Sequence, residues 1–175
     1  ASSEEAATMT SRFVSGEISR NDWVESFRSH VRNVTETQYM LGRGGRNQMG
    51  AGDWGIIDAR VDRQESFIQR FASEIEAKTI SPEQASARSL LYVESTRSAF
   101  EMGRSRAWSD TPMPAYPGDG KQGCLPRCRC RWDYRMVDGE VHATWKLAKG
   151  SEHCAVCSAN AMMYNPYIVT PNFTQ

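Results

Sequence analysis

The sequence predicts an α+β protein in which a bundle of about three long helices precedes a small cysteine-rich module, made of a β-hairpin and a short helix. Apolar residues recur at helical spacing through the first two thirds of the chain, an Asp-Gly pair separates two alternating segments, and all 5 cysteines lie beyond residue 123. We therefore expect a helical domain over residues 1–111. Residues 112–175 should comprise a linker rich in proline and glycine, the cysteine-rich module and an extended tail.

The first long helix is expected to begin after Ser19, which resembles a helix cap together with Asp22. Before it, residues 1–10 are small and polar, so we expect them to be frayed, and a short helix should begin at Phe13 and stop at Gly16. The apolar residues that define the long helix are Trp23, Phe27, Val31, Val34 and Leu41. The glycines expected to end it are Gly42, Gly44 and Gly45.

Two further helices follow in the predicted bundle. The first carries an unbroken helical stripe formed by Trp54, Ile57, Val61, Gln64, Ile68, Phe71 and Ile75. The second begins at Ser81-Pro82-Glu83, which offers an N-cap hydroxyl, a proline at the first helical position and an early acid. It should run to about Trp108, and small residues on one face, including Gly103, would let another helix approach closely.

Nothing in the helical part indicates catalysis, and the sequence does not predict an enzyme, because it lacks a matched nucleophile, base and acid. His30 lies one position from the apolar stripe and is expected to be structural. The His-x-Glu element of zinc deaminases is absent, since Ala143 and Thr144 follow His142. The 21 Lys and Arg balance the 21 Asp and Glu, so a bulk electrostatic footprint for DNA is absent. No apolar run approaches the roughly 18 residues of a membrane span.

Turn chemistry, pairing and alternation agree on a β-hairpin around Asp138-Gly139. A two-residue turn makes Val137 face Glu140 and Trp132 face Trp145. In that register one face is apolar, with Trp132, Tyr134, Met136, Val141, Ala143 and Trp145. The other face is polar, with Arg131, Asp133, Arg135, Glu140, His142, Thr144 and Lys146.

The candidate metal ligands are Cys124, Cys128, Cys130, Cys154, Cys157 and His153. The open end of the hairpin brings the first three cysteines toward Cys154 and Cys157, which are expected in the first turn of a helix. Structural Zn²⁺ held by four thiolates, or by three thiolates and His153, fits this arrangement. The favoured pair is Cys154 with Cys157, and the spacing does not fix which two upstream cysteines complete the shell. Disulfides or free buried thiols are the alternatives, although an odd number of thiols cannot all pair.

Two thiols before a hairpin and two in a first helical turn resemble the treble-clef type of zinc finger. A second resemblance extends over about residues 20–170. The segment ARSLLYVESTRSAFEMGRSRAW resembles the central helix of the phage head-morphogenesis family, the Mu F-like minor head proteins, with the order Glu94-Ser95-Thr96-Arg97 in place of the usual Arg-Thr-Glu. The segment PAYPGDGKQGCLPRCRCRW is similar to the proline-rich stretch and Cys-x-Cys element of that family. The segment WKLAKGSEHCAVCSANAMMYNPY is similar to an extension found in some members.

The family resemblance implies a structural component of a tailed-phage head, assembled in the host cytoplasm and located in the virion. Its implied partners are the portal and the major capsid protein within a larger assembly, with no membrane involved. Packaged DNA is a further implied partner, through Arg127, Arg129, Arg131 and Arg135. The alternative function is a zinc-stabilised nucleic-acid-binding module.

Overall fold

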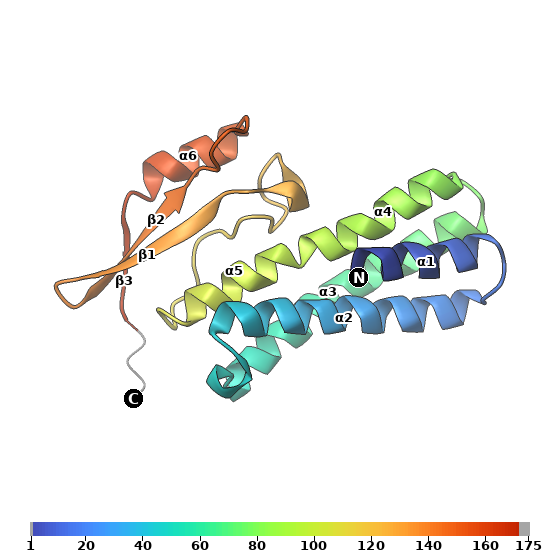
Figure 1. Ribbon diagram of the computed structural model, residues 1–175, viewed down its shortest axis with the longest axis horizontal. Helices are drawn as coiled ribbons and strands as arrows, with labels where there is room; N and C mark the ends of the chain where they lie inside the picture. Colours follow the sequence, from blue (N-terminus) through green and yellow to red (C-terminus); the bar gives the residue numbers. More distant parts are fainter. Residues whose placement is uncertain (1, 172–175) are drawn as a thin grey trace. The chain divides into compact units, whose positions relative to one another are not determined.

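The structure, a computed structural model, describes residues 2–171 and confirms the α+β class (Figure 1). The chain forms two compact units: unit 1 comprises Ala1–Thr37 and Gly50–Thr96, and unit 2 comprises Gln38–Met49 and Arg97–Gln175. The division at Thr96 differs from the expected domain boundary after residue 111. Among the described residues, no helix combines the length and the apolar character that crossing a membrane would need.

Unit 1 is helical, and its first helix begins earlier than expected. The helices are α1 (Ser2–Val14), most of α2 (Arg20–Arg43), α3 (Ala51–Glu76) and α4 (Pro82–Ser95), and α1 lies against α4. The expectation of frayed residues 1–10 was wrong for the described residues from Ser2 onward. Ala6 and Thr10 are fully buried, and the Thr10 hydroxyl donates a hydrogen bond to the Ala6 carbonyl at 2.9 Å. Small residues here form a packing face.

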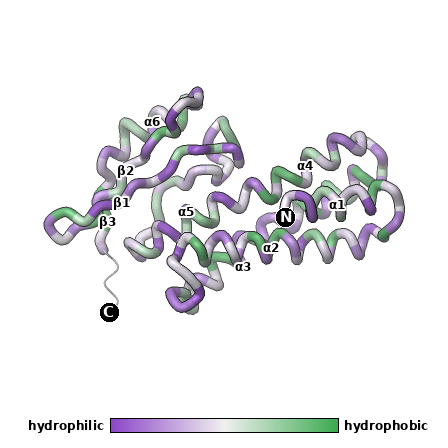
Figure 2. Tube along the Cα trace, in the orientation of Figure 1, coloured by the Kyte–Doolittle hydropathy of each residue, from purple (hydrophilic) through white to green (hydrophobic). Residues whose placement is uncertain are grey.

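Aromatic side chains form the core of unit 1. Trp23 stacks on Phe27 with ring centroids 4.6 Å apart, and Phe71 stacks on Tyr92 at 5.7 Å. Phe27 meets Tyr92 edge-on at 5.3 Å, which joins α2 to α4. Hydropathy alternates between hydrophobic and hydrophilic colours along α2 and α3, as expected for helices with one buried face (Figure 2). Leu41, expected in the buried stripe, is instead 61% exposed.

The helix expected from Pro82 to Trp108 is interrupted at Thr96, so that α4 is followed by a separate α5 (Arg97–Arg106). The Ser95 hydroxyl donates to the Tyr92 carbonyl at 2.7 Å, and the Thr96 hydroxyl donates to the Val93 carbonyl at 2.6 Å. These side-chain bonds compete for carbonyls that backbone amides of the next turn would use. Competition of the Ser95 and Thr96 hydroxyls for helix carbonyls therefore explains the interruption between α4 and α5. The spacing of apolar residues in the sequence does not reveal this interruption.

Two glycines in unit 2 allow the end of α2 and α5 to touch through their backbones. A Cβ atom at Gly42 would overlap the carbonyl oxygen of Phe100, and one at Gly103 would overlap the carbonyl oxygen of Tyr39. This confirms the expectation that Gly103 permits a close helix approach. Any larger residue at either position would push the two helices apart.

A three-stranded antiparallel sheet in the order β1-β2-β3 forms the second part of unit 2 (Figure 1). Strands β1 (Arg131–Val137) and β2 (Glu140–Lys146) have the expected register, in which Trp132 pairs with Trp145 and Val137 with Glu140. The apolar face is buried except at Met136, which lies beside the turn and is 44% exposed. The prediction that Met136 is buried was therefore wrong. Met136 lies on an edge strand near the end of the hairpin, outside the core cluster of this unit.

Strand β3 (Tyr167–Val169) was not expected, since residues after Pro166 were predicted to run extended over the surface. It pairs with β2, so that Val141 faces Val169, and Val169 is buried in the core. Residues 172–175 of the expected tail lie outside the described residues.

The proline- and glycine-rich segment is an ordered part of unit 2 and not an extended linker. Met113 and Ala115 are buried, and the Trp132 indole Nε1 donates to the Ala115 carbonyl at 2.9 Å. Gln122 is 1% exposed, and its amide nitrogen donates to the Asp119 carboxylate at 2.9 Å. This loop therefore forms one wall of the core into which the cysteines fold.

Candidate metal centre

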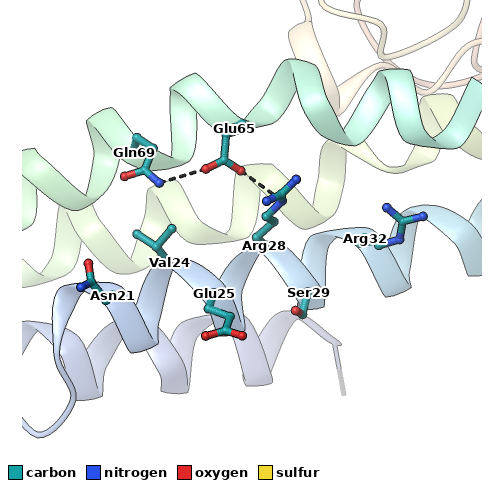
Figure 3. A pocket seen from close by; sticks show the side chains of 8 residues that line it. All are labelled: Asn21, Val24, Glu25, Arg28, Ser29, Arg32, Glu65 and Gln69. Carbon is teal, nitrogen blue, oxygen red and sulfur yellow. Dashed lines mark hydrogen bonds and ion pairs between the residues drawn. The ribbon is translucent and has the colours of Figure 1, made fainter.

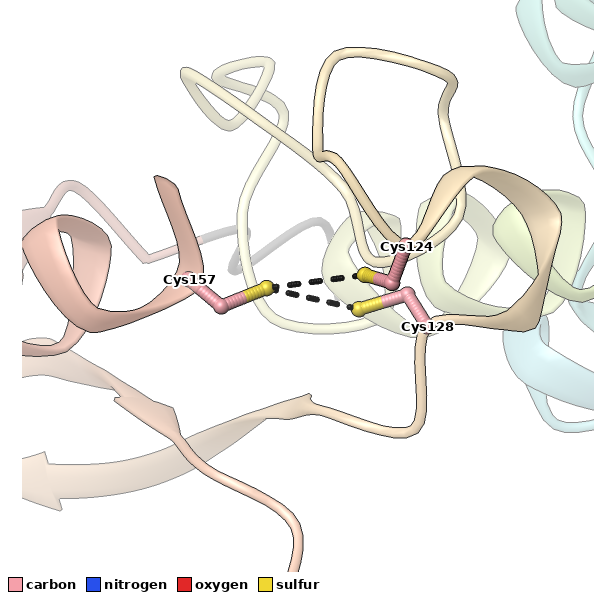
Figure 4. A group of neighbouring side chains, drawn as sticks. All are labelled: Cys124, Cys128 and Cys157. Atoms are coloured by element: carbon pink, nitrogen blue, oxygen red, sulfur yellow. Dashed lines mark hydrogen bonds between the residues drawn. The ribbon is translucent and has the colours of Figure 1, made fainter. Parts of the chain in front are cut away.

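Three cysteine thiols that are distant in the sequence converge in unit 2. The Sγ atoms of Cys124, Cys128 and Cys157 all lie within 4.8 Å of one another. Cys157 Sγ lies 3.6 Å from Cys128 Sγ and 3.9 Å from Cys124 Sγ. Figure 4 shows the side chains of Cys124 and Cys128 pointing toward Cys157, which comes from α6 (Ala155–Met163). We call these three residues the thiol cluster.

A short 3₁₀ turn, Leu125–Arg127, positions Cys124 and Cys128. The Arg127 amide donates to the Cys124 carbonyl at 3.1 Å, and Leu125 adopts a left-handed φ of 50°. This single turn reverses the chain between the two cysteines, so that both thiols can face the same point.

The remaining thiol of the Cys-x-x-Cys pair lies at the start of α6. Cys154 is the N-cap of this helix, and its Sγ accepts a hydrogen bond from the Cys157 backbone amide at 3.5 Å. Its Sγ also lies 3.9 Å from Cys124 Sγ. A Cβ atom at Gly123 would lie 3.3 Å from Cys154 Cβ, so the missing side chain leaves room for this contact. Cys154 therefore borders the thiol cluster.

The separations between these sulfur atoms match a mononuclear tetrahedral metal site. A Zn²⁺ ion with four Zn–S bonds of about 2.3 Å would hold its sulfurs about 3.8 Å apart. The three measured separations are 3.6, 3.9 and 3.9 Å. All five cysteines are free thiols in the described part of the chain.

Burial raises the pKa values of the thiols, and hydrogen bonds from backbone amides lower them. Burial raises the pKa of Cys128 to about 12, although the backbone amide of Cys130 acts against this. Burial also raises the pKa of Cys157. For Cys154 burial acts in the same direction, but hydrogen bonds from the backbone amides of Cys157 and Cys124 outweigh it and lower the pKa to about 6. A metal ion would have to displace protons from the buried thiols, so its binding should weaken at low pH.

The other two predicted ligands lie at the margin of the cluster. Cys130 is buried, with its thiol beside Cys157, but it does not belong to the group of three that shares one centre. His153 is half-buried immediately before the N-cap of α6 and is likewise outside the group. The structure thus brings together Cys124, Cys128 and Cys157, with Cys154 in contact.

Two residues that the sequence did not single out hold the strand leading away from the cluster. The Arg97 guanidinium donates to the Cys130 carbonyl at 3.5 Å. Glu101, only 2% exposed, accepts a hydrogen bond from the Trp132 backbone amide. Both groups come from α5, and they satisfy backbone groups at the edge of β1. Their spacing of four residues on one helix is the only sequence signal for this role.

The predicted arginine group is exposed as expected. Arg127, Arg129, Arg131 and Arg135 all present their side chains to solvent. Within the sheet, Arg131 pairs directly across from Lys146, which places two cations side by side. Arg135 is engaged by Asp133, with Nε and Oδ2 3.7 Å apart.

Unit 1 contains a polar groove of ≈ 530 Å³ between α2 and α3 (Figure 3). Arg28 Nε lies 3.1 Å from Glu65 Oε2, and the Gln69 amide donates to the Glu65 carboxylate at 2.9 Å. Arg32 is paired with Asp58 at 2.5 Å. Arg28 with Glu65 and Arg32 with Asp58 thus form ion pairs on an open surface, which is the arrangement of a solvated helix interface.

Comparisons of the chain with family models, with curated proteins and with solved structures gave no match.

Proposed function

We propose that this chain is a structural component of a tailed-phage head, of the minor head kind, whose unit 2 is stabilised by a structural Zn²⁺ ion. The proposal of a metal ion is supported by the thiol cluster, in which Cys124 and Cys128 from one loop meet Cys157 from α6. In finer terms, the hairpin followed by the short helix is a treble-clef-like zinc module, because paired thiols precede the hairpin and a second pair begins the helix.

The surroundings of the cluster favour a structural role over a catalytic one. Catalytic zinc keeps an open coordination position for water or substrate. Here Cys128 and Cys157 are 1% exposed, and thiols outnumber the positions of a tetrahedral shell. A shell filled by thiolates leaves no position for substrate, which supports a protein without enzymatic activity.

A metal at this position would join two parts of the fold that are distant in the sequence. It would connect the loop before β1 to the start of α6, and the core between them rests mainly on Trp132 and Trp145. Such an ion would add to the apolar core of unit 2 a link between two segments that are distant in the sequence. Zinc would therefore stabilise unit 2 directly.

The phage-head assignment is supported by the resemblance of three segments, residues 87–108, 114–132 and 145–167, to the Mu F-like minor head family. The test is quantitative mass spectrometry of intact particles purified from an infection in which the chain is expressed. Recovery at a fixed number of copies per particle is expected, in company with portal and major capsid protein. Absence from finished particles, despite expression, would contradict a virion role.

A second function is favoured by one observation, the exposed arginines on the cysteine-rich module. Arg127 lies between Cys124 and Cys128, Arg129 and Arg131 follow Cys128, and Lys146 lies opposite Arg131. A nucleic-acid-binding module would show DNA affinity that falls steeply with salt. Replacing these arginines with glutamine would remove most of that affinity. A salt-independent or undetectable interaction with DNA would leave the structural role alone.

A further inference from the structure

We infer that the fourth metal ligand is Cys154, so that Zn²⁺ is held by the thiolates of Cys124, Cys128, Cys154 and Cys157, while Cys130 and His153 stay outside the shell. This inference rests on the proposed structural zinc site and specifies its ligands. It also assigns the class of metal: a single ion with a preference for soft sulfur ligands.

Close separations link the sulfur atoms of four cysteines in a row. Cys154 Sγ lies 3.9 Å from Cys124 Sγ, Cys124 Sγ lies 3.9 Å from Cys157 Sγ, and Cys157 Sγ lies 3.6 Å from Cys128 Sγ. Each separation is close to the edge of about 3.8 Å expected for a tetrahedron around zinc. Three edges of a tetrahedron are therefore approximated, although Cys154 Sγ, close to Cys124 Sγ, lies outside the group of three sulfurs that are all within 4.8 Å of one another. Clusters with several iron atoms would place their ligands around a larger core.

Backbone amides donate hydrogen bonds to the sulfur atoms of Cys154 and Cys128. The Cys157 amide donates to Cys154 Sγ at 3.5 Å, and the Cys130 amide donates to Cys128 Sγ. Amide donors stabilise the negative charge of metal-bound thiolates, and they fix the orientation of first-shell ligands. Cys154 has this support at a helix N-terminus, where the dipole also favours a thiolate.

Cys154 and Cys130, the two candidates for the fourth thiolate ligand, differ in how freely their side chains can turn. Cys154 is half-buried at an N-cap beside Gly123, so a change in its side-chain torsion can bring its sulfur to the open vertex. Cys130 is 3% exposed, and its carbonyl is held by Arg97 at 3.5 Å. The Cys130 thiol meets Cys157, and its side chain is buried, which leaves it less room to turn toward Cys124 than Cys154 has. Cys130 contributes its backbone amide to Cys128 Sγ, which any residue other than proline would also provide.

The test is Co²⁺ substitution of the full-length chain, reduced and freed of metal, followed by competition with Zn²⁺. The sulfur-to-cobalt charge-transfer band reports the number of thiolates, and the visible d–d bands report tetrahedral geometry. We expect four thiolates in the wild type. Cys130→Ala and His153→Ala should retain the four-thiolate spectrum and Zn²⁺ affinity within about threefold, since ligand and supporting-group losses typically cost 10–100-fold.

Cys154→Ser should lose one thiolate from the spectrum and weaken Zn²⁺ binding by at least about tenfold. Because a lost ligand can also prevent folding, Cys154→His provides a second variant that keeps a ligand at the same position. It should bind Co²⁺ with a spectrum of three thiolates and one imidazole. Loss of a thiolate in Cys130→Ala, with an unchanged Cys154→Ser spectrum, would overturn the ligand assignment and leave the zinc site intact. Failure of the folded wild type to bind Co²⁺ or Zn²⁺ would overturn both.

Discussion

The Sγ atoms of Cys128 and Cys157 lie 3.6 Å apart although 29 positions separate these residues in the chain. Cys128 ends a 3₁₀ turn before β1, and Cys157 lies in the first turn of α6. The contact therefore closes a loop that contains the whole β1–β2 hairpin. This contact between two buried thiols is one of the separations on which the proposed metal shell rests.

Removing the metal should loosen unit 2 and leave unit 1 folded. Structural zinc contributes about 10–16 kcal/mol in small zinc-finger peptides near neutral pH, which exceeds the net stability of many whole domains. We expect a chelator to accelerate hydrogen exchange over residues 112–171, while α1 and α3 keep their protection. Hydrogen-exchange mass spectrometry resolves these segments.

Adding Zn²⁺ back to the chelated chain should restore protection, and adding Mg²⁺, which prefers oxygen ligands, should not. Unchanged exchange after chelation under non-reducing conditions would indicate disulfides in place of the metal. Equal loosening of α1 and α3 would show that unit 1 depends on the metal as well, contrary to expectation.

Alanine at Gly42 or Gly103 should destabilise the contact between the end of α2 and α5. The new Cβ atom would overlap the backbone oxygen of Phe100 or of Tyr39, so the helices must separate. Overpacking of this kind costs about 1–3 kcal/mol or more. Gly55 is a matched control, because it lies inside α3 and a Cβ atom there meets nothing within 4 Å. Gly55→Ala should stabilise by up to about 1 kcal/mol, and urea unfolding measures all three variants.

Valine at Gly139 should weaken the hairpin. Asp138 and Gly139 have φ values of 50° and 85°, a left-handed pair that matches a two-residue hairpin turn. A β-branched residue in this conformation costs about 1–2 kcal/mol. Asp138→Asn should be tolerated, because asparagine adopts the same conformation readily. Thermal unfolding followed by near-ultraviolet circular dichroism of the tryptophans tests this, and equal stabilities of the two variants would argue against the turn.

The carboxyl group of Glu101 should make stability depend on pH. Burial raises its pKa, and Arg104, the Trp132 amide, Arg97 and Arg131 oppose this without cancelling it. A raised pKa in the folded state means that the contribution of this group to stability is complete below the unfolded value of 4.5 and is lost as the pH rises through the folded pKa.

Glu101→Gln should therefore stabilise the chain near neutral pH relative to the wild type, and the difference should shrink as the pH falls from the raised folded pKa toward 4.5, below which it should be smallest. Glutamine keeps an oxygen that accepts the Trp132 amide. Glu101→Ala removes that acceptor and should be less stable than Glu101→Gln by about 1–3 kcal/mol at every pH, because neither variant titrates at this position. Urea unfolding across the pH range separates the two effects; a glutamine variant less stable than the wild type at neutral pH would show that the attraction to Arg104 dominates.

The sequence was informative where local chemistry and tertiary packing agree. The Asp138-Gly139 turn fixes the register of β1 and β2, and the same pattern predicts which face is buried. The predicted stripe matched the buried face of α3 at Ile57, Val61, Ile68, Phe71 and Ile75, whereas Trp54 and Gln64, also predicted in it, are only half-buried. The Cys-x-x-Cys spacing placed Cys154 and Cys157 at a helix start, as observed.

Features that depend on distant partners were not predictable in this way. β3 is three residues long and is recognisable only through its pairing with β2. The ordered conformation of the proline-rich segment depends on hydrogen bonds of the buried Gln122 side-chain amide. The choice among the upstream cysteines depends on the 3₁₀ turn after Cys124, which the spacing alone did not reveal.

The most direct test of the zinc site is native mass spectrometry of the full chain purified without added metal and without added reductant. We expect one zinc ion per folded chain, and after acid denaturation a mass that corresponds to five free thiols. A folded chain without metal, or a mass reduced by the hydrogens lost in disulfides, would contradict this expectation.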